Sequence, residues 1–181
     1  MPRWREFADI RIGSALDEVL GMGAVCHPAL ESNWSPQAVA AWSFGFSLPH
    51  RDADSAALRR ALQEATVCHL DVLEQRAHAV VVAFDRRVTG ATIYVPLRDS
   101  AGMSLDSLRK YLRQVWGSPT APAPTLDSWL GRSYRAYMMI PRIQVVTGVR
   151  AATVILIDVA ACTDFDRRVH LAGARGQSEA C

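Results

Sequence analysis

The chain has 181 residues, of which 50% are hydrophobic and 21% are charged, and its formal net charge is +2. This length fits one globular domain that buries its core without help from a metal or a disulfide. The small net charge does not predict a nucleic-acid or membrane partner. No apolar stretch reaches the roughly 18 residues of a membrane-spanning helix, so the composition excludes a helical membrane protein.

The basic residues show an extreme bias, because 19 of the 20 are arginine and only Lys110 is lysine. Forked guanidinium groups recognise phosphate and carboxylate, which is one explanation of the bias. A bacterial genome of high GC content is the alternative, and the wealth of alanine favours it. We therefore predict a bacterial protein.

The first residues contain no apolar signal-peptide core, and no CxxC pair occurs. We therefore predict a cytoplasmic location and no membrane association. In the cytoplasm, widely scattered cysteines are expected to be reduced thiols, which here are Cys26, Cys68, Cys162 and Cys181.

The N-terminal part is predicted to hold short elements. Residues 6–12 favour a strand, and residues 15–20 favour a helix that Ser14 caps. Breaker residues over 26–36 indicate a loop. Residues 40–48 alternate between large apolar and small side chains, which is typical of a strand with one buried face.

A long helix is predicted over residues 55–76, because one stripe at helical spacing holds Leu58, Ala61, Leu62, Ala65, His69 and Val72. A hairpin is predicted over residues 79–96, where two β-rich runs flank the polar segment Asp-Arg-Arg-Val-Thr-Gly. A second helix is predicted over residues 105–116, with Ser104 as its N-cap and Leu105, Leu108, Leu112 and Val115 buried.

The C-terminal part is predicted to begin with a stiff proline-rich loop over residues 118–125. One helical turn over 126–130 would pin this loop through Trp129. A strand over 134–146 is interrupted by Pro141. Residues 153–159 form the most apolar stretch and predict a central strand.

From residue 40 onward, the predicted order is strand, helix, strand, strand, helix, strand, with one further strand. This order is that of a ferredoxin-like α+β fold of βαββαβ type, in which two helices cover one face of an antiparallel sheet. We predict an N-terminal arm over 1–39 that packs on the core, a single domain over 40–172, and a mobile tail over 173–181.

The pentapeptide Phe-Asp-Arg-Arg-Val occurs twice, at residues 84–88 and 165–169. Each copy follows an apolar, strand-like stretch. Arg86 with Arg87, and Arg167 with Arg168, are therefore predicted to be exposed pairs on strand-end turns, able to hold phosphate groups. Two similar turns without a function, or chance, are the alternative.

Histidine and carboxylate residues are the candidates for catalysis. His50 and Asp52 lie at a predicted strand-to-helix junction, where they could ligate a metal or move a proton, although a helix start favours acidic residues for capping alone. His69 could act as a base, or could simply be a hydrogen-bonded core residue. The dipeptide Cys-His occurs twice, at residues 26–27 and 68–69, and this spacing fits no zinc pattern. We predict no metal and no cofactor.

The leading hypothesis is a non-catalytic binding or assembly module that meets a protein partner or a second copy of itself. Exposed sheet edges and the proline-rich loop with Trp129 would form the contact surfaces. One alternative is an RNA- or DNA-binding module that uses the four paired arginines. Another is a small metal-independent enzyme that uses His50 or His69 with a carboxylate such as Asp52 or Asp158.

Overall fold

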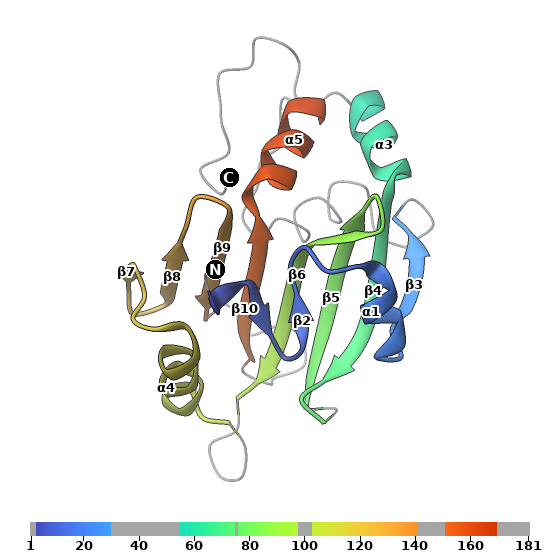
Figure 1. Ribbon diagram of the computed structural model, residues 1–181. Coiled ribbons are helices and arrows are strands. Elements are labelled where there is room, and N and C mark those ends of the chain that lie inside the picture. Colours follow the sequence, from blue (N-terminus) through green and yellow to red (C-terminus); the bar gives the residue numbers. More distant parts are fainter. Residues whose placement is uncertain (1–2, 30–54, 75, 98–102, 141–150, 170–181) are drawn as a thin grey trace.

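The structure is a computed structural model that describes residues 3–29, 55–74, 76–97, 103–140 and 151–169 (Figure 1). Its elements follow in chain order: η1 (Arg3–Arg5), β1 (Glu6–Phe7), β2 (Ile10–Arg11), α1 (Leu16–Gly21), β3 (Val25–Pro28), α3 (Ser55–Gln63), β4 (Ala65–Val72), β5 (Ala77–Phe84), β6 (Arg87–Pro96), α4 (Leu105–Trp116), β7 (Ala121–Pro122), β8 (Leu126–Leu130), β9 (Tyr134–Met139), β10 (Ala151–Asp158) and α5 (Val159–Val169).

The predicted hairpin of residues 79–96 is confirmed as β5 and β6, which pair in antiparallel fashion. Its turn consists of two residues, Asp85 and Arg86, whose φ angles of 48° and 58° lie in the left-handed region. A type I′ turn requires such angles, and its twist matches that of the strands. Thr89 is an extra residue in β6, and its hydroxyl donates a hydrogen bond to the carbonyl of Val82 at 3.2 Å.

Eight antiparallel strands form one sheet in the order β3-β4-β5-β6-β10-β9-β8-β7. Strands β4, β5 and β6 follow one another as a meander, and so do β7 to β10. The two meanders meet where β6 pairs with β10. The strand predicted over residues 153–159 is confirmed as β10, which lies between β6 and β9 and is buried along most of its length.

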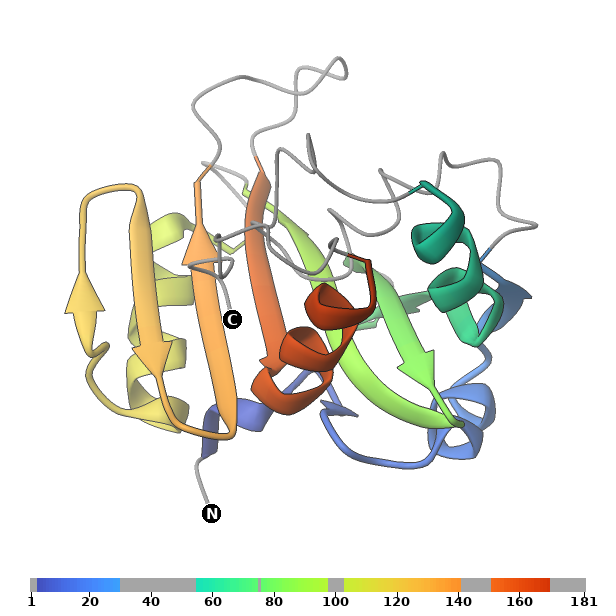
Figure 2. The same ribbon diagram turned by 90° about the horizontal axis from the view of Figure 1, so that it is seen from above.

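Helices cover both faces of this sheet (Figure 2). Helix α4 lies on one face together with the N-terminal segment, and the side chains of Leu108, Leu112 and Trp116 enter the larger core there. The predicted bounds and N-cap of this helix are confirmed, because Ser104 accepts a hydrogen bond from the backbone N–H of Ser107 at 3.1 Å. Leu105 and Val115, predicted to be buried, are only partly buried. Helices α3 and α5 contact each other and close a smaller core on the opposite face.

The ferredoxin-like prediction is wrong. In the described residues, a sheet of eight strands, a separate two-stranded hairpin and four short α-helices make up a mostly β structure. The helices lie on both faces of the sheet and not on one. Two segments predicted as helical are strands, namely residues 65–72 and residues 126–130.

The long helix predicted over residues 55–76 ends at Gln63, and β4 follows. Residues 65–72 fit the periodicity of a helix and also that of a strand. Ala65 and His69 share one helical stripe. As a strand, the segment would place Val67 and His69 on one face, and Cys68 and Leu70 on the other. Pairing with β5 along the whole length of β4 selects the strand.

The prediction of reduced thiols is also wrong for the described cysteines. Strands β3 and β4 place Cys26 directly opposite Cys68, and the two residues form a disulfide across 42 residues of sequence. Cys162 on α5 is disulfide-bonded as well. The spacing of cysteines along the chain does not reveal which strands will be neighbours, so sequence reasoning missed this link.

The N-terminal segment shares the larger core with the sheet through Phe7, Ile10, Ile12, Leu16 and Val19. The domain boundary predicted at residue 39, the strand predicted over 40–48 and the tail predicted from residue 173 lie outside the described residues. In the described part of the chain, no helix is both long and apolar enough to cross a membrane.

Candidate functional site

The two copies of the repeated pentapeptide adopt different local structures. In the first copy, Phe84 ends β5, Asp85 and Arg86 form the turn, and Arg87 begins β6. The second copy lies within helix α5, so the prediction that both arginine pairs sit on strand-end turns is wrong for Arg167 and Arg168. The reason is that β10 ends earlier, at Asp158, and a helix starts directly after it.

The fold nevertheless brings the two copies together. The rings of Phe84 and Phe165, the first residue of each copy, contact each other with centroids 5.8 Å apart. Arg87 and Arg168, the fourth residue of each copy, line one pocket with a volume of about 540 Å³. This convergence makes the pocket the candidate functional site.

The pocket lies between the β5–β6 turn, helix α5 and the N-terminal segment. Its wall is rich in charge, and three aromatic side chains contribute to it. The charged and aromatic lining residues are Arg5, Glu64, Phe84, Asp85, Arg87, Tyr134, Asp158, Asp164, Phe165 and Arg168.

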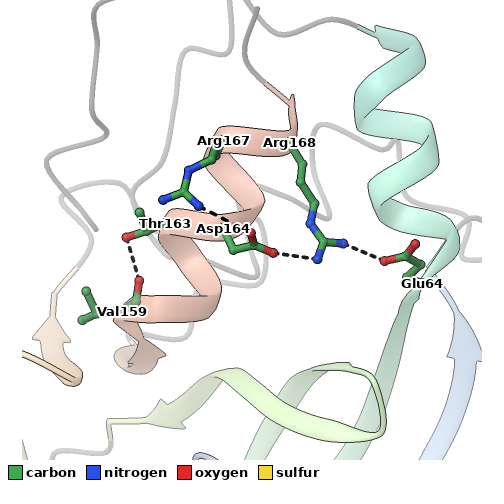
Figure 3. Close-up of polar contacts among 6 residues, drawn as sticks. All are labelled: Glu64, Val159, Thr163, Asp164, Arg167 and Arg168. Carbon is green, nitrogen blue, oxygen red and sulfur yellow. Dashed lines mark hydrogen bonds and ion pairs between the residues drawn. The ribbon is translucent and has the colours of Figure 1, made fainter. Parts of the chain in front are cut away.

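Arg168 is held by two carboxylates that also line the pocket (Figure 3). Its Nη1 lies 2.7 Å from Glu64 Oε2 on the α3 side, and its Nη2 lies 2.7 Å from Asp164 Oδ2 one turn earlier in α5. Burial lowers the pKa of the Arg168 guanidinium, but the charges and hydrogen bonds of Asp164 and Glu64 outweigh this and raise it. The three side chains form a cluster of two ion pairs, which also ties α5 to the end of α3.

Asp158 has a structural role at the first turn of α5. Its Oδ1 accepts hydrogen bonds from the backbone N–H groups of Ala160 at 2.9 Å and Ala161 at 3.1 Å. A carboxylate at this position caps the helix and opposes the partial positive charge of its N-terminus.

Arg86 and Arg87 are neighbours in sequence but have different surroundings. Arg86 forms an ion pair with Asp17 of α1 and does not line the pocket. Arg87 lines the pocket and donates a hydrogen bond to the carbonyl of Gly13 at 3.4 Å. In the described part of the structure, neither Arg87 nor Arg5 takes part in an ion pair.

The catalytic candidates do not converge in the pocket. His50 and Asp52 lie outside the described residues. His69 lies in β4, away from the pocket lining, where its ring stacks on that of His78 at a centroid distance of 5.7 Å. Burial, and then the charges of His78 and His27, lower the pKa of His69. No group of three His, Cys, Asp or Glu side chains within the described ranges could hold a metal ion.

Trp129 is a core residue and not part of a contact surface. Its side chain is 1% exposed, it contacts Trp116 edge to face, and its Nε1 donates a hydrogen bond to the carbonyl of Gly117 at 3.0 Å. Burial of this large ring anchors β8 and leaves nothing of it for a partner.

Sequence reasoning identified two pocket arginines, Arg87 and Arg168, through the pentapeptide repeat, and it also named Asp158. It missed Arg5, Glu64 and Tyr134, because no local signal links residues that come from three distant segments. Comparison with protein families, with curated proteins and with solved structures found no match for this chain.

Proposed function

We propose that this protein is a non-catalytic binding module that holds a small ligand in the pocket between the β5–β6 turn and α5. The observation that carries the proposal is the convergence of both pentapeptide copies on one pocket. A volume of about 540 Å³ falls within the range of small-molecule sites. The aromatic walls and the charged groups are the mixture that such sites use for affinity and orientation.

Two features of the lining support a binding role over a catalytic one. Within the described residues, the pocket wall contains no His, Cys, Ser or Lys side chain. The hydroxyl of Thr89 is engaged with a backbone carbonyl, and Asp158 is engaged as a helix cap. A nucleophile with an adjacent base is therefore not assembled there.

Assembly through a protein partner or a second copy stays a prediction, and the sheet edges favour it little. The edge strand β3 spans four residues and ends in Pro28, and the other edge, β7, spans only Ala121 and Pro122. Short edges with proline offer few N–H groups for strand addition. The sheet edges therefore give little support to a protein partner, whereas the pocket supports a small ligand.

Nucleic-acid binding also stays a prediction. Arg86, Arg167 and Arg168 are each paired with a carboxylate, which neutralises most of the charge that the sequence offers to phosphates. Bacterial origin and a cytoplasmic location are likewise untested predictions. The disulfide-bonded cysteines count against the cytoplasm, because disulfides persist mainly in oxidising compartments.

Native mass spectrometry of the purified protein tests the proposal. We expect a 1:1 complex with a molecule on the order of a few hundred daltons, which is the size that such a pocket holds. The Arg87→Gln variant should lose this molecule, whereas Arg86→Gln, the matched control on the same turn, should keep it. A homodimer without ligand, or co-purifying protein or nucleic acid that both variants retain, would contradict a small-ligand site.

A further inference from the structure

Some charged side chains of the pocket are paired with other groups of the protein, and others are not. Arg168 is paired with both Glu64 and Asp164, which leaves this cluster with one net negative charge, and Asp158 is compensated by the N-terminus of α5. Arg5, Arg87 and Asp85 remain, and none of them takes part in an ion pair among the described residues. The whole lining holds three arginines and four carboxylates, so its formal charge is −1, and the positive charge that is open to a ligand belongs to Arg5 and Arg87.

Arg87 is positioned by the backbone around Gly13. The N–H of Gly13 donates to the carbonyl of Val88 at 2.7 Å, and the N–H of Val88 donates to the carbonyl of Ser14 at 3.0 Å. Gly13 has a φ angle of +86°, and a Cβ added there would lie 3.7 Å from the hydroxyl of Tyr134, so the N-terminal segment passes close to the pocket wall. The Arg87 side chain thus extends from a fixed strand end. Its one weak hydrogen bond, at 3.4 Å, leaves most of the guanidinium N–H groups available to a ligand.

The same lining disfavours a polyanion. Four carboxylates face or border the pocket, so a ligand with several negative charges would meet repulsion at every position except near Arg5 and Arg87. The apolar part of the wall is formed by Phe84, Val88, Ala160, Ala161 and Phe165. A guanidinium matches a carboxylate with two parallel hydrogen bonds, and an apolar wall favours an apolar body.

We propose that the pocket binds a monocarboxylic acid with an apolar body, whose carboxylate is held by Arg87 and Arg5. This inference rests on the proposed function, since it names the ligand class of the same site. A phosphate monoester shares the anionic chemistry but carries close to two charges at neutral pH. The carboxylate carries a single negative charge, which the guanidinium groups of Arg5 and Arg87, without an ion pair among the described residues, can balance beside four acidic residues.

Three probes of the same size test the ligand class: 3-phenylpropionate, its neutral analogue 3-phenylpropionamide, and phenyl phosphate. Binding is followed by titration with NMR detection of the Trp4 indole N–H, which donates to the carbonyl of the pocket residue Tyr134 at 3.5 Å. We expect the carboxylate to bind about tenfold more tightly than the amide, because a charge-assisted bidentate pair is lost in the amide. We also expect it to bind more tightly than the phosphate.

Variants test whether Arg87 and Arg5 hold the carboxylate of the probe. Arg87→Gln and Arg5→Gln should each weaken binding of 3-phenylpropionate about tenfold, while Arg86→Gln should leave it unchanged. Equal affinity for acid and amide, or unchanged binding in both Arg5→Gln and Arg87→Gln, would overturn the proposal. Tighter binding of phenyl phosphate would overturn it in favour of a phosphate site.

The two proposals fail separately. If no probe binds but native mass spectrometry still finds a small molecule that depends on Arg87, the ligand class is wrong and the binding function stands. If neither a probe nor a native ligand depends on Arg87, the proposed function fails with it. Circular dichroism of each variant confirms that the fold is intact, which is expected because Arg87 is exposed.

Discussion

Asp127 is a charged side chain in the interior, and a single arginine compensates it. Its carboxylate is 3% exposed, and Arg109 Nε lies 3.2 Å from its Oδ2. Arg109 Nη2 also donates hydrogen bonds to the carbonyls of Ala123 at 3.3 Å and Pro124 at 2.6 Å. One side chain of α4 therefore holds both β8 and the proline-containing segment that precedes it.

Arg109→Ala should lower the free energy of unfolding by about 3 kcal/mol, because it leaves a buried carboxylate without its partner. Urea unfolding at pH 7 measures the change. Arg113→Ala is the matched control, since Arg113 is exposed on the same helix and forms no ion pair in the described structure. Its effect should stay within about 0.5 kcal/mol. Equal losses in the two variants would show that the ion pair does not stabilise this region.

We predict that His69 makes the free energy of unfolding depend on pH. Its pKa is lowered from the ordinary value of 6.5, first by burial and then by the charges of His78 and His27. The unfolded chain therefore takes up this proton more readily than the folded protein does. The stabilising effect of neutral His69 is therefore present above pH 6.5 and is lost as the pH falls through and below that value.

His69→Gln should flatten the fall in the free energy of unfolding between about pH 7.5 and pH 5, which chemical unfolding at a series of pH values measures. His27→Gln is the control, because the exposed His27 is the smallest of the named causes and should change the profile less. An unchanged profile in the His69→Gln variant would assign the acid sensitivity to other groups.

At the scale of elements, the β8–β9 connection has no room for a side chain at Gly131. A Cβ at this position would lie 2.8 Å from the carbonyl oxygen of Tyr134 and 3.4 Å from the ring of Trp4. The N–H of Gly131 donates to that same carbonyl at 3.1 Å, which closes the turn. Tyr134, which follows this turn at the start of β9, lines the pocket.

Gly131→Ala should lower the free energy of unfolding by roughly 1–3 kcal/mol, as expected for overpacking against backbone. Thermal unfolding measures it, and Gly21→Ala at the end of α1 is the matched control. Nothing lies within 4 Å of a Cβ at Gly21. Alanine there should be neutral or stabilise by up to about 1 kcal/mol, because it favours the helix. A similar loss in both variants would argue against the clash.

At the scale of the whole molecule, the Cys26–Cys68 disulfide ties the edge strand β3 to its neighbour β4. The N-terminal segment, which carries Arg5 and Gly13 of the pocket wall, leads directly into β3. A link across 42 residues restricts the unfolded chain and so favours the folded state.

The double variant Cys26→Ala/Cys68→Ala should therefore lose about 4 kcal/mol of stability by the chain-entropy estimate. Urea unfolding of the variant and the wild type gives the difference. Alkylation without a reductant, followed by mass spectrometry, reports the number of free thiols in the wild type. Free thiols at Cys26 and Cys68 would contradict the link and restore the expectation of a reducing compartment.

The sequence alone determined those elements whose local signals agree with one another. Helix α4 has an N-cap, a clear apolar stripe and a terminal glycine, and its predicted bounds match the structure. The β5–β6 hairpin and strand β10 follow from β-branched runs that no helical pattern competes with. The pentapeptide repeat drew attention to Arg87 and Arg168, and the fold then places both in the lining of one pocket.

Only the tertiary structure decided the rest. Residues 65–72 suit a helix or a strand, and pairing with β5 selects the strand, which in turn places Cys68 opposite Cys26. The same pentapeptide forms a turn after β5 and a helix after β10, because its conformation depends on what precedes and covers it. The pocket joins Arg5, Arg87 and Arg168 from three distant segments. Such proximity comes from long-range packing, which no local sequence pattern encodes.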